Sequence, residues 1–292
     1  MIQEQIEELF SKKHRKNIVL AELLEANGFN ELLMDSVYRV QQYLQQETDS
    51  EIKQARLEEV WKQYQDTDDL IDMIEHMYAL MFEQRGRIPL VSLANMMSTW
   101  LRLPKQYGIQ TMAEIMVVLA ELDFYDIDFH KGQLSFKPKY TVSEETRIRL
   151  NQLMYLPPMI SEPKVITKNK DNYHFTLSPE SMILGGKENH HDGEICLDIL
   201  NRLSQQELVI DQEFVEENKP TKPEGMVVDD WDMYVNQLDF VNELLGSNTI
   251  YLTHKVDKRG RVYSCGYHVD TQGDDYHKAC IELANKHIIE VD

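Results

Sequence analysis

The sequence is poor in cysteine, has fewer basic than acidic residues and contains no long apolar run. Its three cysteines, Cys196, Cys265 and Cys280, lack a Cys-x-x-Cys spacing. This favours free thiols in a reducing cytoplasm over a disulfide framework or a zinc site. The clearest apolar run, residues 115–120, is far shorter than the roughly 20 residues of a membrane span. We therefore expect no membrane partner.

The charge balance limits how the chain could bind nucleic acid. The 292 residues include 50 acidic and 30 basic side chains, which gives a formal net charge of −20. Such a charge argues against a general electrostatic grip on duplex DNA, because the phosphates would be repelled. A local basic channel inside an acidic surface remains compatible with it. A role on DNA would then require another factor that brings the chain to its template.

The apolar pattern predicts a mainly α protein with small β elements, an α+β fold. Residues 1–154 read as a helical N-terminal domain, with a β-hairpin near 124–137 where apolar residues alternate around a Lys-Gly turn. Thr111 and Glu114 form a capping-box pattern that would open a helix ending at Leu122. Helices followed by a hairpin also fit a winged-helix domain. The presumed recognition helix, 112–122, has no Arg or Lys, and this favours a core helix instead.

Residues 251–265 carry the most specific chemistry. Apolar and β-branched residues flank a tip that begins with Asp257 and ends with Gly260, which is typical of a type I turn in a hairpin. Period-two alternation places Arg261, Tyr263 and Cys265 on one face. A fixed cation beside an aromatic ring suits a phosphate with a sugar or base edge next to it. Asp257 could orient the Arg261 guanidinium. A solvated surface turn is the alternative.

The surrounding blocks resemble the single-subunit RNA polymerases of phages and mitochondria. Residues 257–263 are similar to that family's D-x-R-G-R-x-Y block, and Gln272-Gly-Asp-Asp with the helical run 278–284 is similar to its Q-G-x-D and following helix. Residues 155–159 resemble its Y-x-P-M segment, and the 195–206 run with Asn201 resembles an Asn-bearing helix. The resemblance covers about 155–290.

The resemblance implies a right-hand polymerase whose N-terminal part lies in residues 155–292. It implies a much reduced thumb at about 212–248 and a first palm element, with the hairpin, at about 249–270. The implied contacts to template or RNA–DNA hybrid are Asp257, Arg259, Gly260, Arg261, Tyr263, Gln272 and Lys278. Of these, Asp257 would position Arg261, and Gly260 would permit the turn.

The family's catalytic residues follow the D-x-x-G-R block and are missing before the chain ends at Asp292. The resemblance therefore implies the small subunit of a divided, two-subunit polymerase, with no catalytic residue of its own. A large partner subunit would supply the remaining palm, the fingers and the carboxylates that hold Mg²⁺. The other implied partners are a DNA template that is single-stranded or already opened, nascent RNA and a recruiting factor such as a single-stranded-DNA-binding protein, all in the cytoplasm of an infected bacterial host.

Three other interpretations of the sequence concern the origin of the chain, its function and a metal site. The chain could be a fragment or relic of a polymerase. It could instead be a non-catalytic transcription accessory protein that binds nucleic acid or protein through a winged-helix domain. The adjacent His190 and His191 suggest a metal site, but neighbouring residues point in different directions and no His-Glu-x-x-His spacing is present. We predict a polar loop there.

Overall fold

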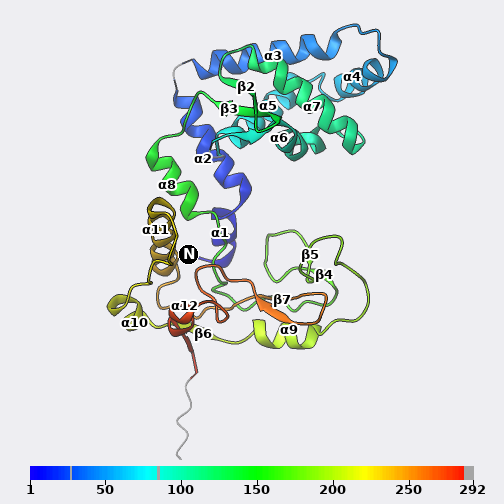
Figure 1. Cartoon of the computed structure of the whole chain (residues 1–292). Helices are drawn as coiled ribbons and strands as arrows, with labels where there is room; N and C mark the ends of the chain where they lie inside the picture. The colour runs from blue at the N-terminus through cyan, green and yellow to red at the C-terminus, as the bar shows by residue number, and fades with distance from the viewer. Residues whose placement is uncertain (27, 84–85, 286–292) are drawn as a thin grey trace, which may run out of the picture. The chain divides into compact units, whose positions relative to one another are not determined.

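The computed structural model describes residues 1–26, 28–83 and 86–285 (Figure 1). The chain forms two compact units: Arg15–Arg147, called the helical unit below, and Met1–His14 with Ile148–Asp292, called the hairpin unit. The predicted boundary near residue 154 therefore lies close to the observed change at 147–148. Residues 1–14 were expected in the N-terminal domain, yet they group with the hairpin unit. The expected chain end within a palm, 286–292, lies outside the described residues.

The described part of the helical unit begins with helices α2 to α6, of which α2 starts in the hairpin unit. They span Lys12–Glu25, Phe29–Gln45, Glu51–Gln63, Thr67–Glu83 and Leu90–Met97. A 3₁₀ turn, η1 (Ser98–Leu101), leads into α7 (Lys105–Ala120). Aromatic rings of α3 and α5 form part of the core, where Tyr78 lies edge-on to Phe29 and to Phe124. The apolar residues of α5, Leu70, Met73, Ile74, Met77, Tyr78 and Met81, form a buried stripe.

A three-stranded antiparallel sheet completes this unit. Its strands are β1 (Ile88–Pro89), β2 (Tyr125–His130) and β3 (Gln133–Pro138), in the order β1-β3-β2. The predicted hairpin near 124–137 is thus confirmed. Strand β3 packs on α6 and strand β2 on α7. The order α5, β1, α6, α7, β2, β3 with this sheet is the element order expected under the winged-helix alternative.

The expected start of the recognition helix was wrong. Helix α7 begins at Lys105, directly after Pro104, and passes through Thr111 without a break. The capping-box pattern misled because both side chains serve tertiary contacts. Arg56 donates to Thr111 Oγ1, at 2.6 Å, and to Glu114 Oε1, at 3.4 Å. Helix α7 therefore includes Lys105 near its exposed start. The earlier objection, that this helix has no Arg or Lys with which to contact DNA, no longer holds.

The hairpin unit contains short elements around two apolar clusters. Its helices are α1 (Gln3–Leu9), α8 (Glu144–Gln152, which begins in the helical unit), α9 (Leu197–Ser204), α10 (Gln212–Glu217), α11 (Val228–Leu245) and α12 (Asp275–Ala279). Its strands pair as β4 (Lys170–Asp171) with β5 (Glu180–Ser181), β6 (Leu208–Ile210) with β9 (Ile281–Leu283), and β7 (His254–Val256) with β8 (Val262–Ser264). One cluster packs around Met159, Tyr173 and Val256, and the other around Leu208, Leu245 and Ile250.

One segment that the sequence predicted as a helix is partly a strand in the structure. The run 278–284 was expected to be helical, but α12 ends at Ala279, and Ile281–Leu283 pair with β6. The apolar Ile281 and Leu283 alternate with Glu282, and pairing with a neighbouring strand outweighs the helical preference of the run. Taken whole, the predicted mainly α fold with small β elements is confirmed.

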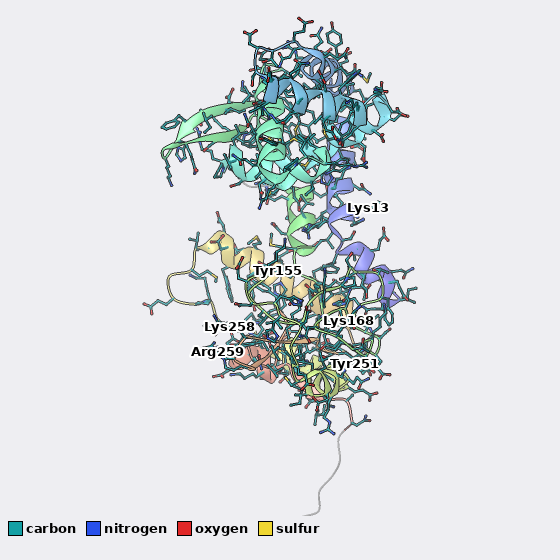
Figure 2. All side chains as sticks on the ribbon, turned by 90° about the vertical axis from the view of Figure 1, so that its right-hand side faces the viewer. Lys13, Tyr155, Lys168, Tyr251, Lys258 and Arg259 are labelled. Atoms are coloured by element: carbon teal, nitrogen blue, oxygen red, sulfur yellow. The ribbon has the colours of Figure 1, made fainter. Side chains whose placement is uncertain are left out.

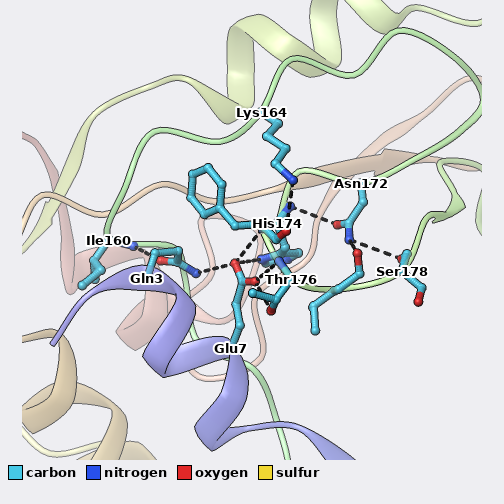
Figure 3. Close-up of polar contacts among 10 residues, drawn as sticks. Gln3, Glu7, Ile160, Lys164, Asn172, His174, Thr176 and Ser178 are labelled. Atoms are coloured by element: carbon cyan, nitrogen blue, oxygen red, sulfur yellow. Dashed lines mark hydrogen bonds and ion pairs between the residues drawn. The ribbon is translucent and has the colours of Figure 1, made fainter.

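A buried carboxylate holds α1 in the hairpin unit (Figure 3). Glu7 is 0% exposed and accepts hydrogen bonds from the backbone N–H groups of Phe175 and Thr176, at 3.0 and 2.6 Å, and from the Thr176 hydroxyl at 2.6 Å. Gln3 donates to Glu7 and accepts from the Ile160 N–H. Removal from water raises the pKa of Glu7, but the hydrogen bonds outweigh it and leave the pKa below its ordinary value. Two loops of this unit thus depend on α1.

Among the described residues, no helix combines the length and the apolar composition that crossing a bilayer would require.

Candidate nucleic-acid interface

The predicted hairpin is present, and its turn has the expected chemistry. Strands β7 and β8 pair antiparallel, with Lys255 opposite Tyr263 and Val256 opposite Val262. The Gly260 N–H donates to the Asp257 carbonyl at 2.9 Å, which closes the four-residue turn. Gly260 has a φ of +81°, in the left-handed region where a side chain would be strained. Glycine is therefore required here by backbone conformation.

The Asp257 carboxylate is the centre of the tip. It accepts from the Arg261 backbone N–H at 3.1 Å and Nε at 2.9 Å, and it lies 2.8 Å from Arg261 Nη2. The predicted contact between Asp257 and Arg261 is therefore present. The same carboxylate also accepts from Arg259, through its backbone N–H at 2.9 Å, its Nε at 3.0 Å and its Nη2 at 2.9 Å. One carboxylate thus holds both guanidinium groups.

The electrostatics of this cluster favour an anion. Partial desolvation raises the pKa of Asp257, but hydrogen bonds and the charge of Arg261 outweigh it and lower the pKa below its ordinary value. One negative and two positive charges leave a net positive tip within a strongly acidic chain. The side chains of Arg259 and Arg261 are 63% and 53% exposed, while that of Asp257 is 14% exposed. The guanidinium groups are therefore held in place and still accessible. Figure 2 labels Lys258 and Arg259 at this tip.

An aromatic ring and a further cation share the Arg261 face. The Arg261 guanidinium lies 5.6 Å from the centre of the Tyr263 ring, as a cation–π contact requires. Lys255 is directly opposite Tyr263 in the register, so both side chains point to the same side of the hairpin. Lys255 pairs with Glu180 at 2.7 Å. Sequence reasoning missed Lys255, although the alternation of the strand together with the turn position would have placed it there.

Gln272 has a structural role that the sequence did not suggest. Its side-chain Oε1 accepts from the Ser264 N–H at 3.1 Å, and its Nε2 donates to the Val262 carbonyl at 3.1 Å. These two backbone groups lie on the edge of β8 that faces away from β7. The amide therefore pairs with the open edge of β8 as a neighbouring strand would. Gln272 supports the strand that carries Arg261 and Tyr263.

Within the described part of the chain, no hydrogen bond or ion pair joins Lys278 to the hairpin tip. It lies in α12 and forms an ion pair with Asp275 at 3.6 Å. The structure thus brings together five of the seven candidate residues, Asp257, Arg259, Gly260, Arg261 and Tyr263, in one turn and strand. Gln272 supports them from behind, and Lys278 is separate.

The other family-like segments surround the hairpin. Met159 and Tyr251 form an antiparallel bridge with reciprocal backbone hydrogen bonds of 3.0 and 2.8 Å, which fixes the 155–159 segment beside the strand leading into β7. The Asn201 side chain bonds both the N–H and the carbonyl of Ile166, each at 2.9 Å. Asn201 therefore anchors a loop.

The side chains of this region do not fit a Mg²⁺ site. The Asp257 carboxylate accepts hydrogen bonds from Arg259 and Arg261, and the positive charges of these two side chains would repel a metal ion. His190 and His191 lie in a loop, where His190 Nδ1 is 2.9 Å from the Ser181 hydroxyl. In the described ranges, no group of three or more His, Cys, Asp or Glu side chains is arranged to hold a metal ion.

Compared with known proteins, the chain matches no protein-family model and no curated protein.

Proposed function

We propose that this chain is the small subunit of a two-subunit, phage-type DNA-dependent RNA polymerase, similar to the heterodimeric RNA polymerase II of phages. The observation that carries the proposal is the Asp257 carboxylate holding two exposed arginines beside Tyr263 on a rigid hairpin. Bidentate guanidinium groups suit phosphate oxygens, and a ring next to them suits a sugar or base edge. The sequence resemblance adds the order and spacing of the surrounding blocks.

In this proposal the chain positions nucleic acid and its partner performs the chemistry. Arg261 and Arg259 contact phosphates of the template or the RNA–DNA hybrid, and Tyr263 packs beside them. The large subunit completes the palm and supplies the carboxylates that hold Mg²⁺, because the side chains described above do not fit that ion. Helices α10 and α11 form the minimal thumb. The enzyme works on single-stranded or opened DNA in the cytoplasm of the infected host, where a single-stranded-DNA-binding protein recruits it.

Purification from the native source tests this proposal. A tagged chain recovered from infected cells is expected to carry a larger partner in equal amount, and the complex is expected to incorporate ribonucleotides on single-stranded DNA in a Mg²⁺-dependent manner. The pure chain without its partner is expected to incorporate none. Incorporation by the pure chain, or recovery without a partner and without activity, would contradict the divided-enzyme proposal.

One observation favours a second function, that of a transcription accessory protein with a winged-helix domain. The helical unit has the winged-helix order of elements, and helix α7 carries Lys105 and Gln106 exposed at its start. Lys131, at the turn between β2 and β3, is also exposed and makes no ion pair among the described residues. A winged helix binds duplex DNA through such positions.

Duplex binding separates the two functions. An accessory DNA reader would bind a duplex in a gel-shift assay, and the Lys105→Ala and Lys131→Ala variants would bind more weakly. The matched control is Lys62→Ala, an exposed lysine of α4. For the small subunit of a polymerase recruited by another factor, we expect the wild-type chain to leave the duplex unshifted at physiological salt.

A further inference from the structure

Two stacked tyrosines lie next to the hairpin in the hairpin unit. The rings of Tyr155 and Tyr267 have centroids 3.7 Å apart and planes inclined by 13°. Tyr267 is nevertheless 48% exposed. Because Tyr155 covers one face of the Tyr267 ring, that exposure falls on its other face and its rim. An exposed aromatic face held rigidly in place is unusual at a surface and suits stacking by a second planar group.

Neighbouring buried rings hold the two stacked tyrosines in place. His268 is 5% exposed and meets both rings nearly edge-on, at 74° to Tyr155 and 86° to Tyr267. Burial lowers the pKa of His268 to about 4, so the imidazole is neutral at physiological pH. Tyr234 packs against His268 with a centroid distance of 5.3 Å. Tyr267 is therefore a fixed ring on a packed base rather than a mobile surface side chain.

The segment that carries Tyr267 is tied to strand β8. Asp270 accepts hydrogen bonds from the Ser264 hydroxyl and from the Gln272 N–H, and Gln272 in turn pairs with the edge of β8. Tyr267 lies six positions after Arg261, so their Cα atoms lie within about 20 Å of each other. This span corresponds to a few nucleotides of a single strand.

A small cavity lies between the hairpin and the segments next to the two tyrosines. Its volume is about 180 Å³, and its lining includes Lys255 and Cys265 from the hairpin, Gly266 next to Tyr267, and Leu156 next to Tyr155. This is below the roughly 300–1,000 Å³ of sites for drug-sized ligands. The size suits part of one nucleotide. Glu180 also lines the cavity and pairs with Lys255 at 2.7 Å, so the cation available for a phosphate is the more exposed Arg261 guanidinium rather than the Lys255 ammonium.

We propose that Tyr267, supported by Tyr155, is a stacking position for an unpaired base of single-stranded DNA or RNA, and that Arg261 holds a neighbouring phosphate. The inference deepens the proposed function and rests on it, since it names the unpaired strand as the ligand of this surface. Stacking depends little on base identity, because every base has a planar face. The position would therefore hold template or transcript without reading its sequence.

The test is oligonucleotide binding by the full chain, measured by fluorescence anisotropy at low salt. The probes are a single-stranded 12-mer of DNA, its RNA counterpart, the DNA duplex, and a DNA 12-mer with abasic positions at its centre. The wild type is expected to bind both single strands and to bind the duplex and the abasic strand more weakly. Tyr267→Ala should weaken single-strand binding by about five- to hundredfold. Tyr267→Phe should retain it. Tyr38→Ala is the control, since Tyr38 is a 60% exposed tyrosine of α3.

The abasic probe separates stacking from a folding defect. If Tyr267 stacks on a base, Tyr267→Ala should cost little extra affinity on the abasic strand, because the partner of the ring is already absent. An equal loss on intact and abasic strands would overturn the inference. So would unchanged binding by Tyr267→Ala while Arg261→Ala binds weakly, a result that leaves the proposed function standing. The proposed function has a separate test: if the native wild-type complex incorporates no ribonucleotides, the proposed function is contradicted.

Discussion

The Asp257 carboxylate binds the Arg261 side chain through Nε and Nη2, at 2.9 and 2.8 Å, while it also accepts from the Arg261 backbone N–H at 3.1 Å. A single side chain therefore shapes the turn and orients the cation that the turn presents. The functional interpretation depends on this coupling, because a guanidinium fixed before the ligand arrives loses less conformational entropy on binding.

Asp257→Asn should separate these two tasks. The amide keeps an acceptor for the backbone N–H groups but removes the charge that holds the guanidinium groups. We expect a folded chain whose assembled enzyme extends RNA up to about tenfold more slowly, a milder loss than removal of Arg261 itself. Extension on a short single-stranded template measures this, with Asp275→Asn as a control carboxylate in α12. Equal rates for Asp257→Asn and wild type would mean that Arg261 needs no positioning.

Gln272→Ala should loosen strand β8. The variant leaves the Ser264 N–H and the Val262 carbonyl without their partner, and water replaces it incompletely. We expect a loss of about 1 kcal/mol in the free energy of unfolding and faster hydrogen exchange at the Ser264 amide. Gln106→Ala, which changes an exposed glutamine of α7, is the control. Unaltered exchange at Ser264 would contradict the structural role assigned to Gln272.

Glu7→Gln should change how stability depends on pH. The pKa of Glu7 is lowered in the folded state, so its contribution is complete above its ordinary value of 4.5 and is lost as the pH falls further. Burial lowers the pKa of His174 as well, so His174 also destabilises the fold as the pH falls below 6.5. At pH 7 the variant should lose roughly 2–4 kcal/mol, since buried donors lose a charged acceptor. Thermal unfolding from pH 7 to pH 3.5 measures both effects.

The comparison between wild type and Glu7→Gln isolates the carboxylate. Their difference in stability should shrink below pH 4.5, where Glu7 loses its charge. Between pH 6.5 and 4.5 the loss linked to His174 should be greater in the variant, because burial lowers the pKa of that imidazole and the Glu7 carboxylate, 3.5 Å from His174 Nδ1, partly raises it again. A difference that stays constant down to pH 3.5 would show that Glu7 contributes through packing alone.

His190→Ala with His191→Ala should leave the metal content of the purified chain unchanged. The two residues lie in a loop after the Gly185-Gly186 turn, and His190 pairs with Ser181. Elemental analysis of the wild type and the double variant checks this. Stoichiometric zinc that disappears in the variant would reveal a site that the sequence and the structure both failed to indicate.

Local chemistry explains which parts of the fold could be predicted. The hairpin tip was predictable because Asp at the first position and Gly at the fourth restrict the backbone to one kind of turn. The start of α7 was not, because Thr111 and Glu114 have a helix-opening spacing but use their side chains on Arg56. Strand β9 was missed because its pairing partner β6 lies more than 70 positions earlier in the sequence.

In the candidate site too, contacts between near neighbours in the sequence were predictable, and contacts between distant segments were not. Asp257 and Arg261 are four residues apart, so their contact follows from the turn. Lys255 and Gln272 depend on strand register and on a loop that folds back, and neither is visible in a local pattern. The stack of Tyr155 on Tyr267 joins segments more than 100 residues apart. Long-range contacts of this kind require the structure.

RNA extension by the assembled enzyme with Arg261→Ala tests the central claim most directly. The substitution removes a fixed phosphate contact, and we predict extension on a short single-stranded template about ten- to hundredfold slower than wild type, with an unchanged thermal unfolding curve. Arg261→Lys should recover part of the rate, because an ammonium lacks the guanidinium fork. Arg39→Ala, which removes another arginine paired with a carboxylate, should extend as wild type does. Wild-type extension by the Arg261→Ala enzyme would contradict the account and leave the hairpin tip as a surface turn.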